Sequence, residues 1–72
     1  MNKIIKLYCN EADRLTVEKA MKTYTDQDGF MGSKIAIEDR VMLLFVCSIF
    51  KVKNLKHDLE LLNNIGIKTE MR

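Results

Sequence analysis

The sequence predicts an α+β fold in which strands and helices follow one another in the order β-α-β-β-α-β. The spacing of apolar residues changes several times between a period of two, typical of strands, and a period near 3.6, typical of helices. Turn-forming residues fall at points where the period changes. With 72 residues, 47% hydrophobic and 31% charged, the chain has the size and balance of one globular domain over residues 1–72.

A strand and a helix are predicted first, over residues 3–9 and 11–25. Residues 3–9 alternate between two faces, with Ile5, Leu7 and Cys9 on one of them. Asn10 is a favoured helix cap, and carboxylates follow it in the first turn, where the helix dipole favours anions. The apolar residues of this helix recur at helical spacing: Val17, Ala20, Met21 and Tyr24.

A hairpin is predicted in the middle of the chain. Residues 26–29 (DQDG) have turn chemistry, so a loop is expected over residues 26–33. The strand at 34–38 is joined by the polar turn 38–40 to a third strand at 41–48, and so short a turn indicates a hairpin. The third strand is apolar on both faces, which favours a central position in the sheet.

A second helix and a last strand complete the predicted order. From about Lys51 the apolar residues form one helical stripe, made of Val52, Leu55, Leu59 and Leu62. Asn64 and Gly66 are typical of a helix end. Residues 65–71 then alternate strictly, which predicts an edge strand whose inward residues are Ile65, Ile67, Thr69 and Met71.

This order resembles the ferredoxin-like fold, and the resemblance covers the whole chain. It implies a four-stranded antiparallel sheet with two helices on one face and the first and third strands at the centre. The other face is then open to solvent. The sequence leaves open which set of the third strand lies there: Val41, Leu43 and Phe45, or Met42, Leu44 and Val46.

An open face of this composition is expected to be a protein interface, because soluble monomers seldom expose large apolar patches. The candidate partner-binding residues are Ile4, Tyr8, Leu44 and Phe45, with Phe30 and Met31 of the predicted loop as secondary candidates. The expected function is a non-catalytic, cytoplasmic protein-interaction module, a small regulator or inhibitor that forms a homodimer or binds a partner protein. Frequent Lys, Asn and Ile hint at an AT-rich coding genome, such as that of a low-GC bacterium or its phage.

Two other functions are kept as alternatives. The first is a module that binds single-stranded nucleic acid through Lys6, Tyr8 and Lys34, although a net charge of +2 is small for that role. The second is a sensor of a small ligand at a dimer interface. Solution mass and the salt dependence of binding separate these alternatives from apolar protein association.

The sequence carries no pattern that predicts an enzyme, a metal, a cofactor or a membrane partner. The two cysteines, Cys9 and Cys47, lie in separate apolar runs and are expected to be reduced, buried hydrophobes. His57 has no other His or Cys close to it in the sequence, which argues against a metal site. No Gly-rich phosphate loop and no carboxylate pair suited to acid–base catalysis occurs.

Overall fold

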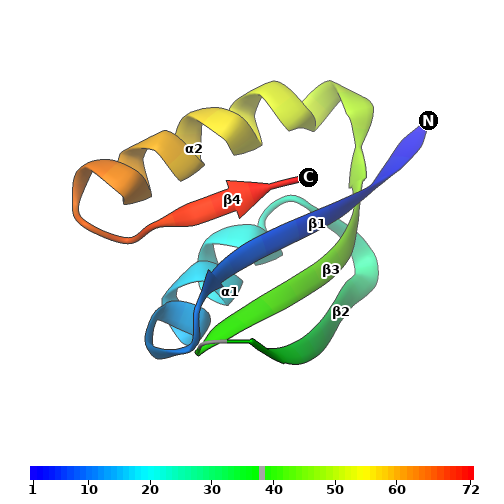
Figure 1. Ribbon diagram of the computed structural model, residues 1–72. Helices are drawn as coiled ribbons and strands as arrows, with labels where there is room; N and C mark the ends of the chain where they lie inside the picture. Colours follow the sequence, from blue (N-terminus) through cyan, green and yellow to red (C-terminus); the bar gives the residue numbers. More distant parts are fainter. Residues whose placement is uncertain (38) are drawn as a thin grey trace.

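The computed structural model describes the backbone of every residue except Glu38, and the side chains of residues 1–25 and 39–72. Figure 1 shows the elements, which are in chain order β1 (Asn2–Asn10), α1 (Arg14–Lys22), β2 (Thr25–Ile37), β3 (Arg40–Ser48), α2 (Val52–Asn64) and β4 (Thr69–Met71). Two short 3-10 turns, η1 (Glu11–Asp13) and η2 (Ile49–Lys51), precede the helices. The predicted α+β class is confirmed. Among the described residues, no helix has the length and apolar character needed to span a membrane.

The strands pair antiparallel in the order β2-β3-β1-β4. β1 and β3 lie at the centre and pair without interruption from Asn2–Ser48 to Asn10–Arg40. β4 pairs with the outer edge of β1 only between Leu7–Met71 and Cys9–Thr69. The sheet is therefore built from three long strands, and β4 adds a short edge to it (Figure 1).

The predicted ferredoxin-like arrangement, with a full fourth strand over residues 65–71, is wrong. The chain forms three long antiparallel strands and two helices, and only Thr69–Met71 of the expected last strand is extended and paired. The physical reason lies at the end of α2, which runs on to Asn64. Its closing turn takes up the next residues, so the alternating pattern that begins at Ile65 is not used as a strand.

Gly66 closes α2 in a Schellman motif. The Gly66 N–H donates to the Asn63 carbonyl at 3.1 Å, and the Ile67 N–H donates to the Leu62 carbonyl at 3.0 Å. Gly66 has φ +92°, a left-handed conformation that an L side chain rarely adopts. Ile67 and Leu62 both pack against the core, which is the apolar contact that accompanies this motif. Ile65, predicted to face the helices, is instead 72% exposed.

The core lies between one face of the sheet and both helices. Its fully buried side chains come from alternate residues of the two central strands and from the predicted helical stripes: Ile5, Leu7, Cys9, Val41, Leu43, Phe45, Cys47, Val17, Met21, Leu55 and Leu59. Both helices therefore cover the same face of the sheet (Figure 1). The predicted inward faces of β1, α1 and α2 are confirmed.

β2 differs from its prediction because the expected loop over residues 26–33 belongs to the strand. Its pairing with β3 shifts register between Thr25 and Phe30 and again between Ser33 and Ile37. The turn chemistry of residues 26–29 thus coincides with irregular pairing rather than with a loop. The hairpin itself is confirmed, since Ile37 pairs with Arg40. Asp39 in that turn has φ 63°, which Asp tolerates better than most residues.

Candidate protein-interaction surface

The face of the sheet opposite the helices carries the main candidate site. Directly opposite residues of β1 and β3 share a face, and the pairs Ile4–Val46, Lys6–Leu44 and Tyr8–Met42 alternate with the buried pairs of the core. We call this surface the open face and define it by the six residues of these pairs together with Glu70 and Arg72. The register therefore places Met42, Leu44 and Val46 on the outward face of β3. The alternate residues Val41, Leu43 and Phe45 face the helices.

The open face has an apolar strip at its centre. Ile4 is 61% exposed, while Met42, Leu44 and Val46 are each half-buried among their neighbours. Lys6 is exposed and lies across from Leu44. The strip is accordingly narrow, runs along the two central strands, and carries a cation at its middle.

Charged side chains border the strip at the β4 edge. The Arg72 guanidinium lies over the Tyr8 ring, 5.2 Å from its centroid, which is a cation–π contact. Arg72 Nη2 also lies 3.2 Å from Glu70 Oε2. The backbone groups of Arg72 and Lys6 hydrogen-bond in both directions, at 2.8 and 3.2 Å, which holds Arg72 beside β1. One face of the Tyr8 ring is therefore already covered by a cation.

The structure brings three of the predicted partner-binding residues together on one face and buries a fourth on the other face. Ile4, Tyr8 and Leu44 lie on the open face. Phe45 is fully buried on the helix side, so its prediction as a surface contact is wrong. Phe45 pairs with Ile5, and both point into the core because that side of β1 is apolar throughout.

The secondary candidates Phe30 and Met31, and the nucleic-acid candidate Lys34, lie in β2. Their side chains fall outside the residues whose side chains the structure describes. The backbone register pairs Phe30 with Phe45 and Met31 with Leu44. The predicted roles of these three residues stay predictions.

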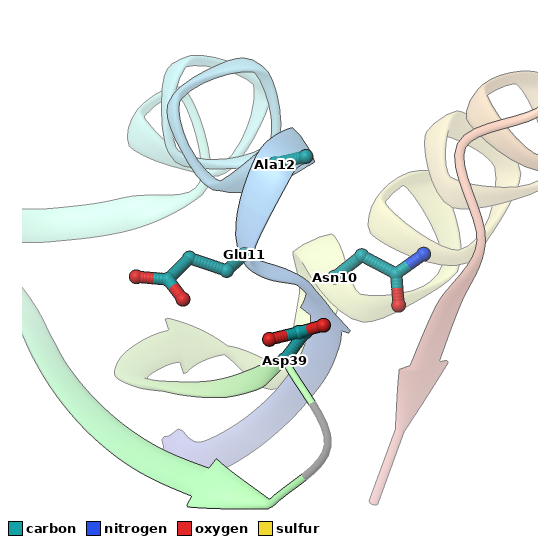
Figure 2. Close-up of a pocket in the computed structure, with 4 residues that line it drawn as sticks. All are labelled: Asn10, Glu11, Ala12 and Asp39. Carbon is teal, nitrogen blue, oxygen red and sulfur yellow. The ribbon is translucent and has the colours of Figure 1, made fainter.

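An open hollow of about 520 Å³ lies where β1 meets the β2–β3 turn, lined by Asn10, Glu11, Ala12 and Asp39. The Glu11 N–H donates to the Asp39 carbonyl at 2.7 Å and ties the two connections together. Figure 2 shows the Glu11 carboxylate and the Asn10 amide pointing in opposite directions. The described residues contain no group of three His, Cys, Asp or Glu side chains that could hold a metal ion. The hollow therefore lacks a convergent donor set.

The two cysteines are free and fully buried, as predicted. Burial raises the pKa of the Cys9 thiol, and the nearby carboxylate of Asp13 raises it further. A raised pKa keeps the thiol protonated, and the thiolate is the reactive form. Cys9 therefore acts as a packing residue of the core.

Sequence reasoning missed one surface feature, the exposed residues at the junction of β3 and α2. Phe50 is 82% exposed and Ile49 is 43% exposed. Phe50 could have been found, because it falls outside the stripe formed by Val52 and Leu55 and has no place in the strand that ends at Ser48.

Comparison of the chain with protein-family models, with curated proteins and with solved structures found no match.

Proposed function

We propose that this protein is a non-catalytic protein-interaction module, a small regulator or inhibitor that acts in the cytoplasm by covering part of a protein surface. The observation that carries the proposal is the apolar strip of Ile4, Met42, Leu44 and Val46 on a sheet face that neither helix covers. Contiguous apolar surface with a charged border is how protein interfaces are commonly built. Two free, buried thiols suit a reducing compartment.

The occupant of the open face is a second copy of the chain or a different protein with an apolar surface. Light scattering on a sizing column across a dilution series separates the two. A mass of twice the chain that persists on dilution supports a homodimer through this face. A monomer directs the search to a heterologous partner.

Leu44→Glu is the variant that tests the open face, and Leu43→Glu is its matched control. Leu44 lies opposite Lys6, so a glutamate there gains a cross-strand ion pair and the domain should stay folded. Leu43 is fully buried, so a charge there should unfold the domain. Circular dichroism checks both expectations.

The functional result expected for folded Leu44→Glu is loss of association. The dimer should dissociate, or a partner retained by the immobilised wild-type protein should no longer be retained. The proposal would be contradicted if the wild-type protein were a monomer and if the immobilised wild-type and Leu44→Glu proteins retained the same set of partner proteins. Leu44→Glu failing to fold while Leu43→Glu folds would overturn the assignment of the faces.

Binding of single-stranded nucleic acid is the second candidate, favoured by Lys6 and Arg72 beside an aromatic ring. Arg72 covers one face of the Tyr8 ring, so a base that stacks on that face would have to displace Arg72. An oligonucleotide titration at two salt concentrations tests this function, because phosphate contacts weaken steeply with salt. Tyr8→Ala should abolish such binding. A small-ligand sensor requires a dimer, so the dilution series is its first test also.

A further inference from the structure

The residues of the open face form two neighbouring rows that run across β3, β1 and β4, which lie side by side in this order (Figure 1). Lys6 pairs with β3 on one side and exchanges two backbone hydrogen bonds with Arg72 on the other, so the first row, which we call the basic row, is Leu44, Lys6 and Arg72. The register of Tyr8 with both neighbouring strands gives the second row, which we call the acidic row: Met42, Tyr8 and Glu70.

The charge at the β4 edge changes sign from one row to the next. Arg72 and Glu70 lie 3.2 Å apart, yet their side chains are 65% and 50% exposed, so both remain open to another molecule. Continued across the sheet, the two rows reach Met31 and Ser33 of β2 by register, and neither residue type carries a charge. The charge pattern of the two rows is therefore set by Lys6, Arg72 and Glu70.

A second copy of the chain can be laid face to face on this pattern with its strands antiparallel. Sheets that pack in this way lie about 10 Å apart, and the side chains of their inner faces meet. We consider a two-fold axis between the sheets that runs perpendicular to the strands at the level of Leu7, between the two rows. Such an axis exchanges the basic row with the acidic row and keeps each strand opposite its own counterpart.

Each residue of the two rows then meets a residue of complementary character. Arg72 lies opposite Glu70 of the second copy, and the same contact is made a second time by symmetry, so four charges alternate in sign at the β4 edge. Lys6 lies opposite the Tyr8 ring, which attracts a cation. Leu44 lies opposite Met42, which closes the apolar strip from both sides.

The rows on either side of this centre form the border of the contact. They bring Ile4 opposite Asn10 and Val46 opposite Arg40 of the second copy, because each of these pairs occupies one row of the β1–β3 ladder. The aliphatic stem of an arginine can cover an apolar side chain while its charge stays in water. The contact therefore has an apolar and charge-paired centre with a polar border.

Other two-fold arrangements of the open face lack this complementarity. An axis along the basic row sets Lys6 and Arg72 against themselves, and an axis along the acidic row sets Glu70 against itself. An axis parallel to the strands along β1 again opposes Lys6 to itself. Like charges that face each other across an interface are costly. An axis moved to lie between Ile4 and Lys6 leaves both β4 charges without a counterpart.

We propose that the open face is covered by a second copy of the chain in this antiparallel two-fold arrangement. The inference rests on the proposed function and names the partner of the same surface. Charge complementarity selects a second copy, because a two-fold axis between the rows matches the face to itself without any further residue. An isologous contact of this kind is closed, so the assembly stops at a dimer.

The experiment reverses the charges at the β4 edge and measures mass by light scattering across a dilution series. The wild-type protein should be a dimer. Glu70→Arg opposes cations to cations, and Arg72→Glu opposes carboxylates to carboxylates, so each variant alone should raise the dissociation constant about tenfold. An equal mixture of the two variants should regain the wild-type dissociation constant, because the cations of one copy then meet the carboxylates of the other.

The double variant Glu70→Arg/Arg72→Glu is the matched control. It loses the contact between Arg72 and the Tyr8 ring but still opposes unlike charges across the two-fold axis. It should therefore dimerise as the wild-type protein does, and circular dichroism checks that all variants are folded. Single variants that dimerise as tightly as the wild-type protein, or a mixture that stays dissociated, would overturn the arrangement.

Leu44→Glu separates failure of this inference from failure of the proposed function. A dimer that dissociates with Leu44→Glu but is indifferent to the charge reversals would overturn the arrangement and keep the open face as the interface. A monomeric wild-type protein would overturn the second copy as the occupant. If that monomer retains a partner protein that Leu44→Glu does not retain, the proposed function stands with a heterologous partner.

Discussion

Tyr24 connects the two helices through its hydroxyl group. It lies just beyond α1 and donates a hydrogen bond to the carboxylate of Asp58 in α2. Its oxygen also lies 3.3 Å from the Asn54 carbonyl oxygen. The hydrogen bond to Asp58 and the burial of the ring raise the pKa of Tyr24 to about 12.

Tyr24→Phe should lower the free energy of unfolding by about 1.5 kcal/mol at neutral pH, because it removes a hydrogen bond to a charged group. The pKa of Tyr24 is higher in the folded state than its reference value of 10.0. The unfolded chain therefore loses the phenolic proton first, and the stabilisation should fade as pH rises from about 10 to about 12. Urea denaturation of both proteins across this pH range measures the difference.

Tyr8→Phe is the control for this experiment, since Tyr8 lies on the open face and its contact with Arg72 is made by the ring. Its effect should stay within about 0.5 kcal/mol, as for most surface changes. Equal denaturation midpoints for Tyr24→Phe and the wild-type protein at neutral pH would contradict the role assigned to the hydroxyl.

At the scale of single elements, the sequence predicts the core-facing residues most accurately where one face of the element is apolar and the other is polar. β1 and α2 have that character, and their inward residues are as predicted. β3 is apolar on both faces, so its orientation depends on its register against β1, where Lys6 marks the outward side. Register arises from long-range pairing, which the sequence alone does not reveal. The sequence alone therefore offers both Leu44 and Phe45 as outward candidates, and the register selects Leu44. The outward positions of Ile4 and Tyr8 follow from the alternation of β1 itself.

The last strand shows that a clear alternating pattern does not always form a strand. Residues 65–71 alternate as a strand would, but Gly66 ends α2 in a left-handed conformation and takes residues beside it into the closing turn. Local helix-end chemistry overrides alternation there. β2 shows a related effect, since its turn-forming residues appear as register shifts within a paired strand.

Leu55→Ala and Leu61→Ala form a matched pair within α2. Leu55 is fully buried under the sheet, so its truncation should cost about 3 kcal/mol of unfolding free energy. Leu61 is 52% exposed on the same helix, so its truncation should cost less than about 0.5 kcal/mol. Chemical denaturation monitored by circular dichroism compares them. Similar losses for both variants would show that α2 packs differently from this description.

At the scale of the whole molecule, the cysteines report on global unfolding. Cys9 and Cys47 both have no exposed surface, and they belong to the two central strands. A small thiol reagent should therefore modify neither in the native protein and both in denaturant. The rate of modification under native conditions should follow the population of the unfolded state.

Rapid modification of either thiol in the native protein would contradict the burial of the core. Cys9→Ala and Cys47→Ala variants, each with one remaining thiol, assign any reaction to its strand. The two remaining thiols should react at the same rate, since β1 and β3 pair along their whole length and should open together.

The pairing of Arg72 with Lys6 and of Thr69–Met71 with β1 has a consequence for solubility. These few residues occupy backbone groups on the outer edge of the longest uninterrupted ladder in the described sheet. A long strand with free N–H and C=O groups and apolar side chains is a template on which further chains can add. β4 acts as a cap on that template, and its charged residues Glu70 and Arg72 discourage a neighbouring chain from replacing it. Residues 69–72 thus cover this edge of β1 and should hinder the addition of further chains to it.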